Sequence, residues 1–216
     1  MCRVRARSAP ILRRRASRLI ATRTVEHVPR VPRPQIPDGN YHVGVRGVRK
    51  TPLFHDDPDR HEILGRLGEV VVRYGWQCLA YCLMTNHFHL VVKTVEPTIS
   101  RGMQWLNSRY CEYFNGRYGI EGHAIERRFW SKVVACEEQL LTVIPYVLLN
   151  PVRAGICARP GDWPWSSYLA TARRAPAPSW LAVEQVQLMF AADVVTGAER
   201  FVEFLDAVSV RDMSGV

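Results

Sequence analysis

The chain has 216 residues, of which 47% are hydrophobic and 23% are charged, enough for one domain with a sizeable core but short for two full catalytic domains. No apolar run approaches the roughly 20 residues that span a bilayer, which argues against a membrane role. The net charge of +9 lies in residues 1–37, where ten Arg accompany one acid; the remainder has 29 − 10 = 19 basic and 20 − 1 = 19 acidic residues and is formally neutral. That remainder needs a local basic patch if it is to bind a polyanion.

Residues 1–37 are rich in Arg and Pro and lack the apolar periodicity of a segment that buries one face, so we expect a disordered tail. Its role is open among an organelle transit peptide, an accidental upstream extension and a non-specific nucleic-acid arm. The six Cys form no CxxC pair, and the chain shows no recognisable signal peptide. This predicts a cytoplasmic protein with buried thiols rather than a zinc site.

Strand and helix patterns alternate after residue 38. A short alternating strand at 41–46 precedes a helix over 58–74. The runs 76–83 and 87–93 are strand-like and predict an antiparallel hairpin. A helix over 98–118, a strand over 127–136 and a helix over 137–149, stopped by Asn150-Pro151, complete the order. This order predicts an α+β fold, an antiparallel sheet with helices on one face.

The sequence changes character after Gly155. A Trp- and Pro-rich stretch at 162–168 is followed by a Pro/Ala linker near 175–178. Two amphipathic segments, 182–191 and 197–208, then indicate a C-terminal helical appendage.

The sharpest local feature is the run Asn86-His87-Phe88-His89. Side chains two apart on a strand project from one face, so His87 and His89 offer two imidazoles side by side while Phe88 packs behind them. Such a pair is half of a metal site, although the solvated face of an ordinary strand gives the same pattern. A catalytic divalent cation needs a third protein ligand and open positions for water or substrate.

The third helix offers both the missing ligand and a nucleophile. Tyr146 and Asn150 stand four apart, on one helical face. The amide oxygen of Asn150 is a hard ligand suited to Mg²⁺ or Mn²⁺. A phenol is a poor nucleophile, with an ordinary pKa of about 10, but it attacks a phosphodiester when a metal polarises the phosphate, and the product is a covalent phosphotyrosine. A packed core tyrosine is the alternative for Tyr146.

Four ordered elements resemble one family, the single-tyrosine transposases with a His-hydrophobic-His signature, and most closely the REP-associated tyrosine transposases and their insertion-sequence relatives. The resemblance covers about residues 38–172. The elements are Tyr41-His-Val43, Met84-Thr-Asn-His-Phe-His-Leu90, Tyr146-Val-Leu-Leu-Asn-Pro-Val-Arg-Ala-Gly155 and Asp162-Trp-Pro-Trp-Ser-Ser-Tyr168.

This resemblance implies a ferredoxin-like catalytic domain over 38–172, between the tail of residues 1–37 and a helical extension over 173–216. It implies cleavage and rejoining of single-stranded DNA at hairpin-flanked sites, with a 5′-phosphotyrosine link and a free 3′-hydroxyl. The histidine pair of the family falls on His87 and His89, its nucleophile on Tyr146 and its amide-bearing metal ligand on Asn150. Some relatives exchange the tyrosine helix within a dimer, whereas those with a similar C-terminal extension tend to be monomers. The resemblance therefore favours a monomer here and leaves a dimer open.

The sequence departs from the family pattern at two positions. Thr85 stands in a turn where the family commonly has Pro, and a hairpin loop tolerates this. Pro145 precedes the nucleophile inside a helix, where proline removes a hydrogen bond and kinks the axis at a cost of about 3 kcal/mol.

Three tyrosines of the second helix rank below Tyr146 as candidate nucleophiles and are expected to be core or base-stacking groups. They are Tyr110, Tyr113 and Tyr118.

Several residues around the site are candidates for DNA contacts. Basic side chains are suited to phosphates and Trp rings to unpaired bases, although core packing and surface ion pairs are alternatives for each. His42 is a further candidate, for supporting the metal pair or packing within its strand. The candidates for DNA are Arg127, Arg128, Lys132, Arg153 and Trp165, with Trp130 and Trp163 as further stacking groups.

Three rival functions stay open. A catalytically idle module that binds DNA hairpins keeps the fold without the chemistry. A replication-initiator or relaxase-like nickase shares the histidine pair. A metal-dependent hydrolase unrelated to DNA explains the histidines but neither Tyr146 nor the Trp-rich stretch.

Overall fold

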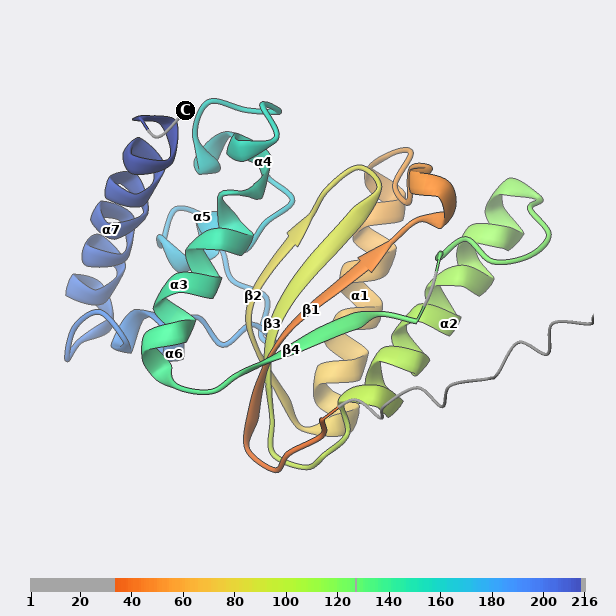
Figure 1. The fold of residues 1–216 in the computed structure, drawn as a ribbon, viewed down its shortest axis with the longest axis horizontal. Helices are drawn as coiled ribbons and strands as arrows, with labels where there is room; N and C mark the ends of the chain where they lie inside the picture. Colours follow the sequence, from red (N-terminus) through yellow and green to blue (C-terminus); the bar gives the residue numbers. More distant parts are fainter. Residues whose placement is uncertain (1–33, 127, 215–216) are drawn as a thin grey trace, which may run out of the picture. The chain divides into compact units, whose positions relative to one another are not determined.

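The computed structural model describes residues 34–126 and 128–214, with side chains up to residue 210. Residues 1–33 of the predicted tail and Arg127 lie outside the described residues. Strands β1 (Gly39–Arg46), β2 (Trp76–Leu83), β3 (His87–Thr94) and β4 (Trp130–Val134) form one sheet (Figure 1). The helices are α1 (Asp57–Tyr74), α2 (Ile99–Tyr118), α3 (Glu137–Leu148), α4 (Asn150–Arg153), α5 (Tyr168–Thr171), α6 (Val183–Leu188) and α7 (Val194–Ser214), with 3-10 turns at Val48–Lys50 and Pro160–Asp162.

The sheet order is β2-β3-β1-β4, and every neighbouring pair is antiparallel. Because β1 and β3 are adjacent at the centre, Val45 pairs with Phe88 and Gly44 with His89. The order confirms the predicted α+β, ferredoxin-like antiparallel sheet. It also places the histidine strand between two neighbours, where its backbone is held on both sides.

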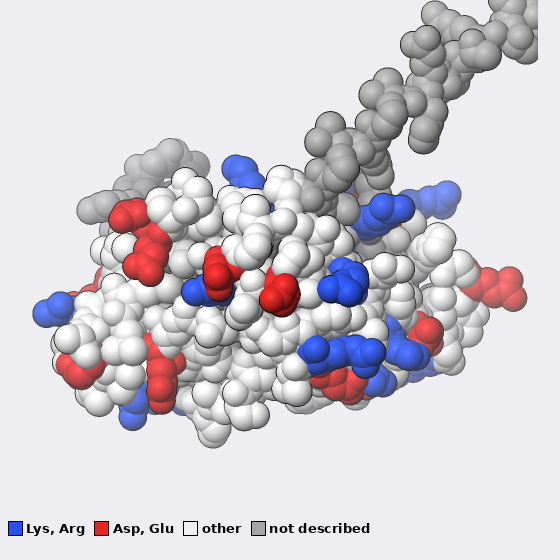
Figure 2. All heavy atoms as spheres, turned by 90° about the horizontal axis from the view of Figure 1, so that it is seen from below, with Lys and Arg blue, Asp and Glu red and all other residues white. Residues whose placement is uncertain are grey.

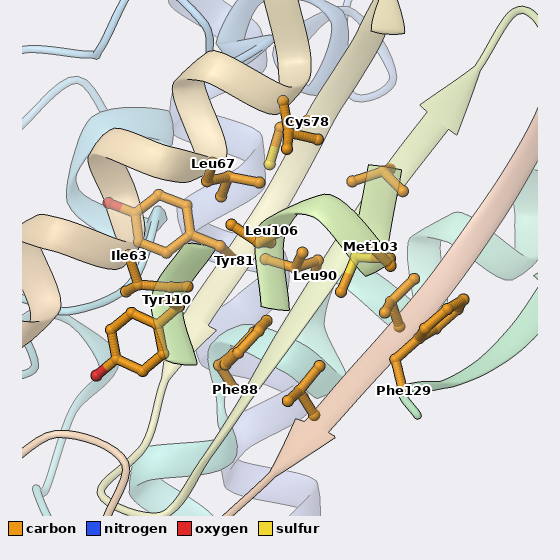
Figure 3. Close-up of a cluster of buried hydrophobic side chains, with 14 of the residues drawn as sticks. Ile63, Leu67, Cys78, Tyr81, Phe88, Leu90, Met103, Leu106, Tyr110 and Phe129 are labelled. Atoms are coloured by element: carbon orange, nitrogen blue, oxygen red, sulfur yellow. The ribbon is translucent and has the colours of Figure 1, made fainter. Parts of the chain in front are cut away.

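Helices α1 and α2 pack on one face of this sheet and form the larger core. Alternation along β3 turns Phe88, Leu90 and Val92 toward these helices. Figure 3 shows Phe88 and Leu90 among side chains from both helices. Helix α1 is bounded by its caps, since the Asp56 carboxylate accepts from the N–H of Asp59 and Gly75 adopts the left-handed conformation that ends the helix.

Helices also cover the opposite face of the sheet, whereas the order of elements predicted helices on one face. Apolar side chains on this face, such as Leu79 and Val91, need a cover to leave water. Helix α3 and the C-terminal helices provide it through a second core (Figure 1). Its members from the helices are Leu140, Ile144, Val147, Leu148, Tyr168, Val186, Phe201 and Leu205.

The predicted boundaries shift at three places. The strand expected over 127–136 is regular only over Trp130–Val134, and the segments expected at 182–191 and 197–208 become Val183–Leu188 and Val194–Ser214. Among the described residues, no helix is both long and apolar enough to cross a bilayer. On the face drawn in Figure 2, basic and acidic side chains are interspersed, in keeping with the neutral balance beyond residue 37.

Candidate active site

His87 and His89 lie on the α3 face of the sheet, opposite the buried Phe88. Their ring centroids are 5.1 Å apart. His89 is 6% exposed, and His87 is half-buried at the start of the strand. The alternation expected from the sequence therefore brings two imidazoles together on one face.

One nitrogen of each imidazole already has a partner. Nδ1 of His87 lies 2.7 Å from Oδ1 of Asn86, so the imidazole donates there. Nδ1 of His89 lies 3.2 Å from Nε2 of His42. Metal-binding histidines in proteins almost always use their second nitrogen in this way.

The imidazoles are held in their neutral form. Burial, followed by the charge of Lys132, lowers the pKa of His42 to about 4. Burial, followed by the neighbouring His87, lowers the pKa of His89 to about 3, and burial also lowers the pKa of His87. Neutral imidazole is the form that coordinates a cation.

Tyr146 lies beside this pair in the same chain. Its ring centroid is 6.1 Å from that of His89 and 5.7 Å from that of His42, and the side chain is 43% exposed. Pro145 does not end the helix, because α3 continues to Leu148 and the N–H of Leu149 donates to the Pro145 carbonyl at 2.8 Å. The phenol thus combines access to solvent with a position against the histidines.

Asn150 and Arg153 hold the next turn against Tyr146. The amide nitrogen of Asn150 donates to the Tyr146 carbonyl at 2.7 Å. Arg153 donates to the same carbonyl at 3.1 Å, and its guanidinium lies 4.9 Å from the centroid of the Tyr146 ring. Arg153 therefore stacks on the candidate nucleophile while placing a positive charge beside it.

The donor set fits a hard or borderline divalent cation. Among the described residues, no group of three His, Cys, Asp or Glu side chains has the arrangement of a metal site. The fit rests on two neutral imidazoles, each with a partner at Nδ1, to which an amide oxygen from Asn150 would add a third ligand.

Trp130 and Lys132, on β4, border the site. The Trp130 ring is 46% exposed, and its centroid lies 4.6 Å from that of His42 and 5.8 Å from that of His89. Lys132 pairs with His42 across β1 and β4. An aromatic ring and a cation thus flank the imidazoles, and both kinds of side chain occur in sites that bind single-stranded nucleic acids.

The other DNA candidates lie in different surroundings. Trp165 packs on α1, with its ring 5.1 Å from His61 and under the Arg60 guanidinium at 5.3 Å. Trp163 donates to the Leu83 carbonyl at 3.0 Å. Arg128 is exposed and lines a cavity of about 640 Å³ beside α2.

The rival tyrosines of α2 lie on the other face of the sheet. The buried Tyr110 donates to the Leu53 carbonyl. Tyr113 and Tyr118 donate to the buried Asp59 carboxylate at 3.3 and 2.8 Å. Burial raises the pKa of Tyr110 and Tyr113, and raises that of Tyr118 to about 12. These hydroxyls therefore make structural hydrogen bonds and are poor candidates for the nucleophile.

Comparisons with known proteins agree with this architecture. Residues 35–145 match the model of a family described as IS200-like transposases. A Haemophilus influenzae protein named as a REP-associated tyrosine transposase is 26% identical over 106 residues, 44% of this chain and 60% of that protein. The match thus spans less than two thirds of the relative. A solved REP-associated tyrosine transposase bound to a REP hairpin has a TM-score of 0.59 at 18% identity, covering 72% of this chain and 92% of the other, which shows a shared fold.

The family match includes the histidine strand and most of α3. It ends at Pro145, one residue before Tyr146, and covers 145 − 34 = 111 of the 216 residues, just over half. The chain belongs to the IS200-like transposase family.

Proposed function

We propose that the protein cleaves and rejoins single-stranded DNA with Tyr146 as the nucleophile. The observation that carries this proposal is the position of an exposed phenol within 6.1 Å of the buried His89 ring, in one chain. No second chain is needed to bring these groups together. The fold shared with a hairpin-bound transposase supports a hairpin-bearing DNA as the substrate.

The chemistry follows from the groups on the α3 face. His87, His89 and Asn150 would hold Mg²⁺ or Mn²⁺, which when bound would polarise a non-bridging phosphate oxygen. The phenolic oxygen of Tyr146 gives up its proton to water and forms a bond to phosphorus. The bond between phosphorus and the 3′-oxygen breaks, and the 3′-oxygen takes up a proton from water to leave as a hydroxyl. The product is a 5′-phosphotyrosine, and this ester keeps the energy of the broken phosphodiester bond for the rejoining step.

The side chains around Tyr146 assist by position and charge. Arg153 fixes the phenol ring from one side and offsets negative charge that develops beside it. Lys132 and Trp130 border the imidazoles and are our candidates to contact a phosphate and an unpaired base. Arg128 and Trp165 remain candidates for more distant contacts, with Trp165 less available because Arg60 covers its ring. Arg127, outside the described residues, stays a candidate from the sequence alone.

We also propose that the protein acts on single-stranded DNA in the cytoplasm. The five Cys among the described residues are free thiols, which fits the cytoplasmic location that the sequence predicts.

The test is formation of a covalent adduct. The protein is incubated with a labelled, hairpin-bearing single-stranded oligonucleotide and Mn²⁺ or Mg²⁺, and then resolved under denaturing conditions. We expect an adduct with the wild type, none with Tyr146→Phe and none in EDTA. Tyr113→Phe, which removes a hydroxyl from the other face of the sheet, is the matched control and should retain the adduct.

Other outcomes would identify a rival function. A metal-independent gel shift of hairpin DNA without any adduct would favour an idle binding module. Nicking of supercoiled DNA at one site would favour a replication-initiator or relaxase-like enzyme. An undiminished adduct with Tyr146→Phe would overturn the assignment of the nucleophile.

A further inference from the structure

His42 and His89 form a buried pair between adjacent strands. They are 7% and 6% exposed, and Nε2 of His42 lies 3.2 Å from Nδ1 of His89. The planes of the two rings meet at 37°, with centroids 5.3 Å apart. At this distance the two nitrogens share one hydrogen, because a neutral imidazole has one donor and one acceptor nitrogen.

Two arrangements of that hydrogen are possible, and they differ in what they leave on His89. If His42 donates from Nε2, then Nδ1 of His89 accepts and Nε2 of His89 carries the other hydrogen. That nitrogen then has no lone pair for a cation. If His89 donates from Nδ1, its Nε2 keeps a lone pair and can be a ligand.

We infer that His42 is a positioning residue that accepts the Nδ1 hydrogen of His89 and thereby keeps Nε2 of His89 free of a proton for the metal. The inference rests on the proposed function, since it assigns to the same site the group that fixes the tautomer of one ligand. Asn86 has the corresponding place beside His87, where its Oδ1 accepts from Nδ1 at 2.7 Å. The two ligands are thus oriented by two different acceptors.

The surroundings of His42 hold it in this place. Trp130 meets its ring edge-on at 4.6 Å, and Tyr146 does so at 5.7 Å. Lys132 is the register partner of His42 across β1 and β4. Gly44, two residues along β1 from His42 and paired with Trp130, leaves the space that the Trp130 ring fills, since a Cβ there would lie 2.2 Å from Cε2 of the ring.

An imidazole acceptor also suits the chemistry. Metal-bound histidines often donate to a carboxylate, which would place a negative charge next to the anionic phosphate. His42 fixes the tautomer without that charge. The same ring contacts the candidate nucleophile, so one side chain bridges the ligand strand and the helix of Tyr146.

The first measurement is made on the wild type without metal. Long-range ¹H–¹⁵N correlation spectra report which nitrogen of each histidine is protonated. We expect His89 in the Nδ1–H form. The Nε2–H form at His89 would overturn the inference, and this result needs no variant.

The second measurement compares two substitutions of His42. In His42→Gln the side-chain amide oxygen can accept the Nδ1 hydrogen of His89 near the former Nε2. The leucine side chain of His42→Leu has no hydrogen-bond acceptor. Mn²⁺ affinity, measured from the EPR signal of free Mn²⁺, should fall about 10- to 100-fold in His42→Leu and recover largely in His42→Gln. Thermal unfolding checks that both variants fold. Unchanged Mn²⁺ affinity and an unchanged His89 tautomer in a folded His42→Leu protein would refute the positioning role.

A double variant separates this role from general loosening of the site. In a His89→Ala background, His42→Leu should have little further effect on Mn²⁺ affinity, because the ligand that it orients is gone. An equal effect in both backgrounds would contradict the inference. A wild type that binds Mn²⁺ with the expected tautomer but forms no DNA adduct would defeat the proposed function and leave the role of His42 standing.

Discussion

Acidification should destabilise the metal-free protein through the buried imidazoles. The unfolded chain takes up a proton at each histidine below a pKa of about 6.5, whereas the folded pKa is about 4 for His42 and about 3 for His89. The stability that the neutral pair contributes is thus fully present above pH 6.5 and is lost as the pH falls toward the folded values. The slope is about 1.4 kcal/mol per pH unit for each proton.

Between pH 6.5 and pH 5 this amounts to about 2 kcal/mol for each imidazole, or about 4 kcal/mol for the pair. That is a large share of the roughly 5–15 kcal/mol that stabilises a typical domain. The assay is urea unfolding in EDTA at pH 7 and pH 5. The control is His42→Gln combined with His89→Gln, which carries no titrating group at these two positions and should lose much less. An equal loss in wild type and control, or none in the wild type, would refute the reasoning.

Three further outcomes can be checked with the same protein. Gly44→Ala should displace the Trp130 ring, lowering stability by about 1 kcal/mol in urea unfolding and weakening single-stranded DNA binding in fluorescence titrations. Phe201→Ala should cost about 3–5 kcal/mol, measured the same way, because this buried side chain anchors α7 in the second core. Mixing Tyr146→Phe with His89→Ala should restore no DNA adduct, since each site is completed within one chain; recovery in the mixture would indicate exchange of α3 between subunits.

The local pattern was enough to predict the histidine strand. Period-two alternation placed Phe88 behind the pair, and the structure buries Phe88 in the larger core while both imidazoles face α3. The order of elements predicted the sheet for the same reason, since each segment carried its own periodicity. Both features depend on periodicity within short segments, which can be identified in a single sequence.

Pairing between distant strands was not predictable in this way. The contact between His42 and His89 depends on the register of β1 against β3, 47 residues apart in sequence. The sequence named His42 as a candidate for supporting the metal pair or for packing within its strand, and the register of β1 against β3 sets it beside His89. The contact between Trp165 and Arg60 could not be predicted either, because Arg60 lies on α1, far from Trp165 in the sequence.

The second core explains why the site lies within one chain. Helix α3 packs on the sheet and buries Leu140, Ile144 and Val147 in the same core that contains Phe201 and Leu205 of α7. Exchange of α3 between subunits would have to re-form these contacts on the partner's sheet, and any large apolar side chain left exposed would cost about 1.5–3 kcal/mol. The C-terminal helices therefore do more than extend the domain. They hold the helix of the candidate nucleophile on its own sheet, and a monomer with a complete site is the state that we expect.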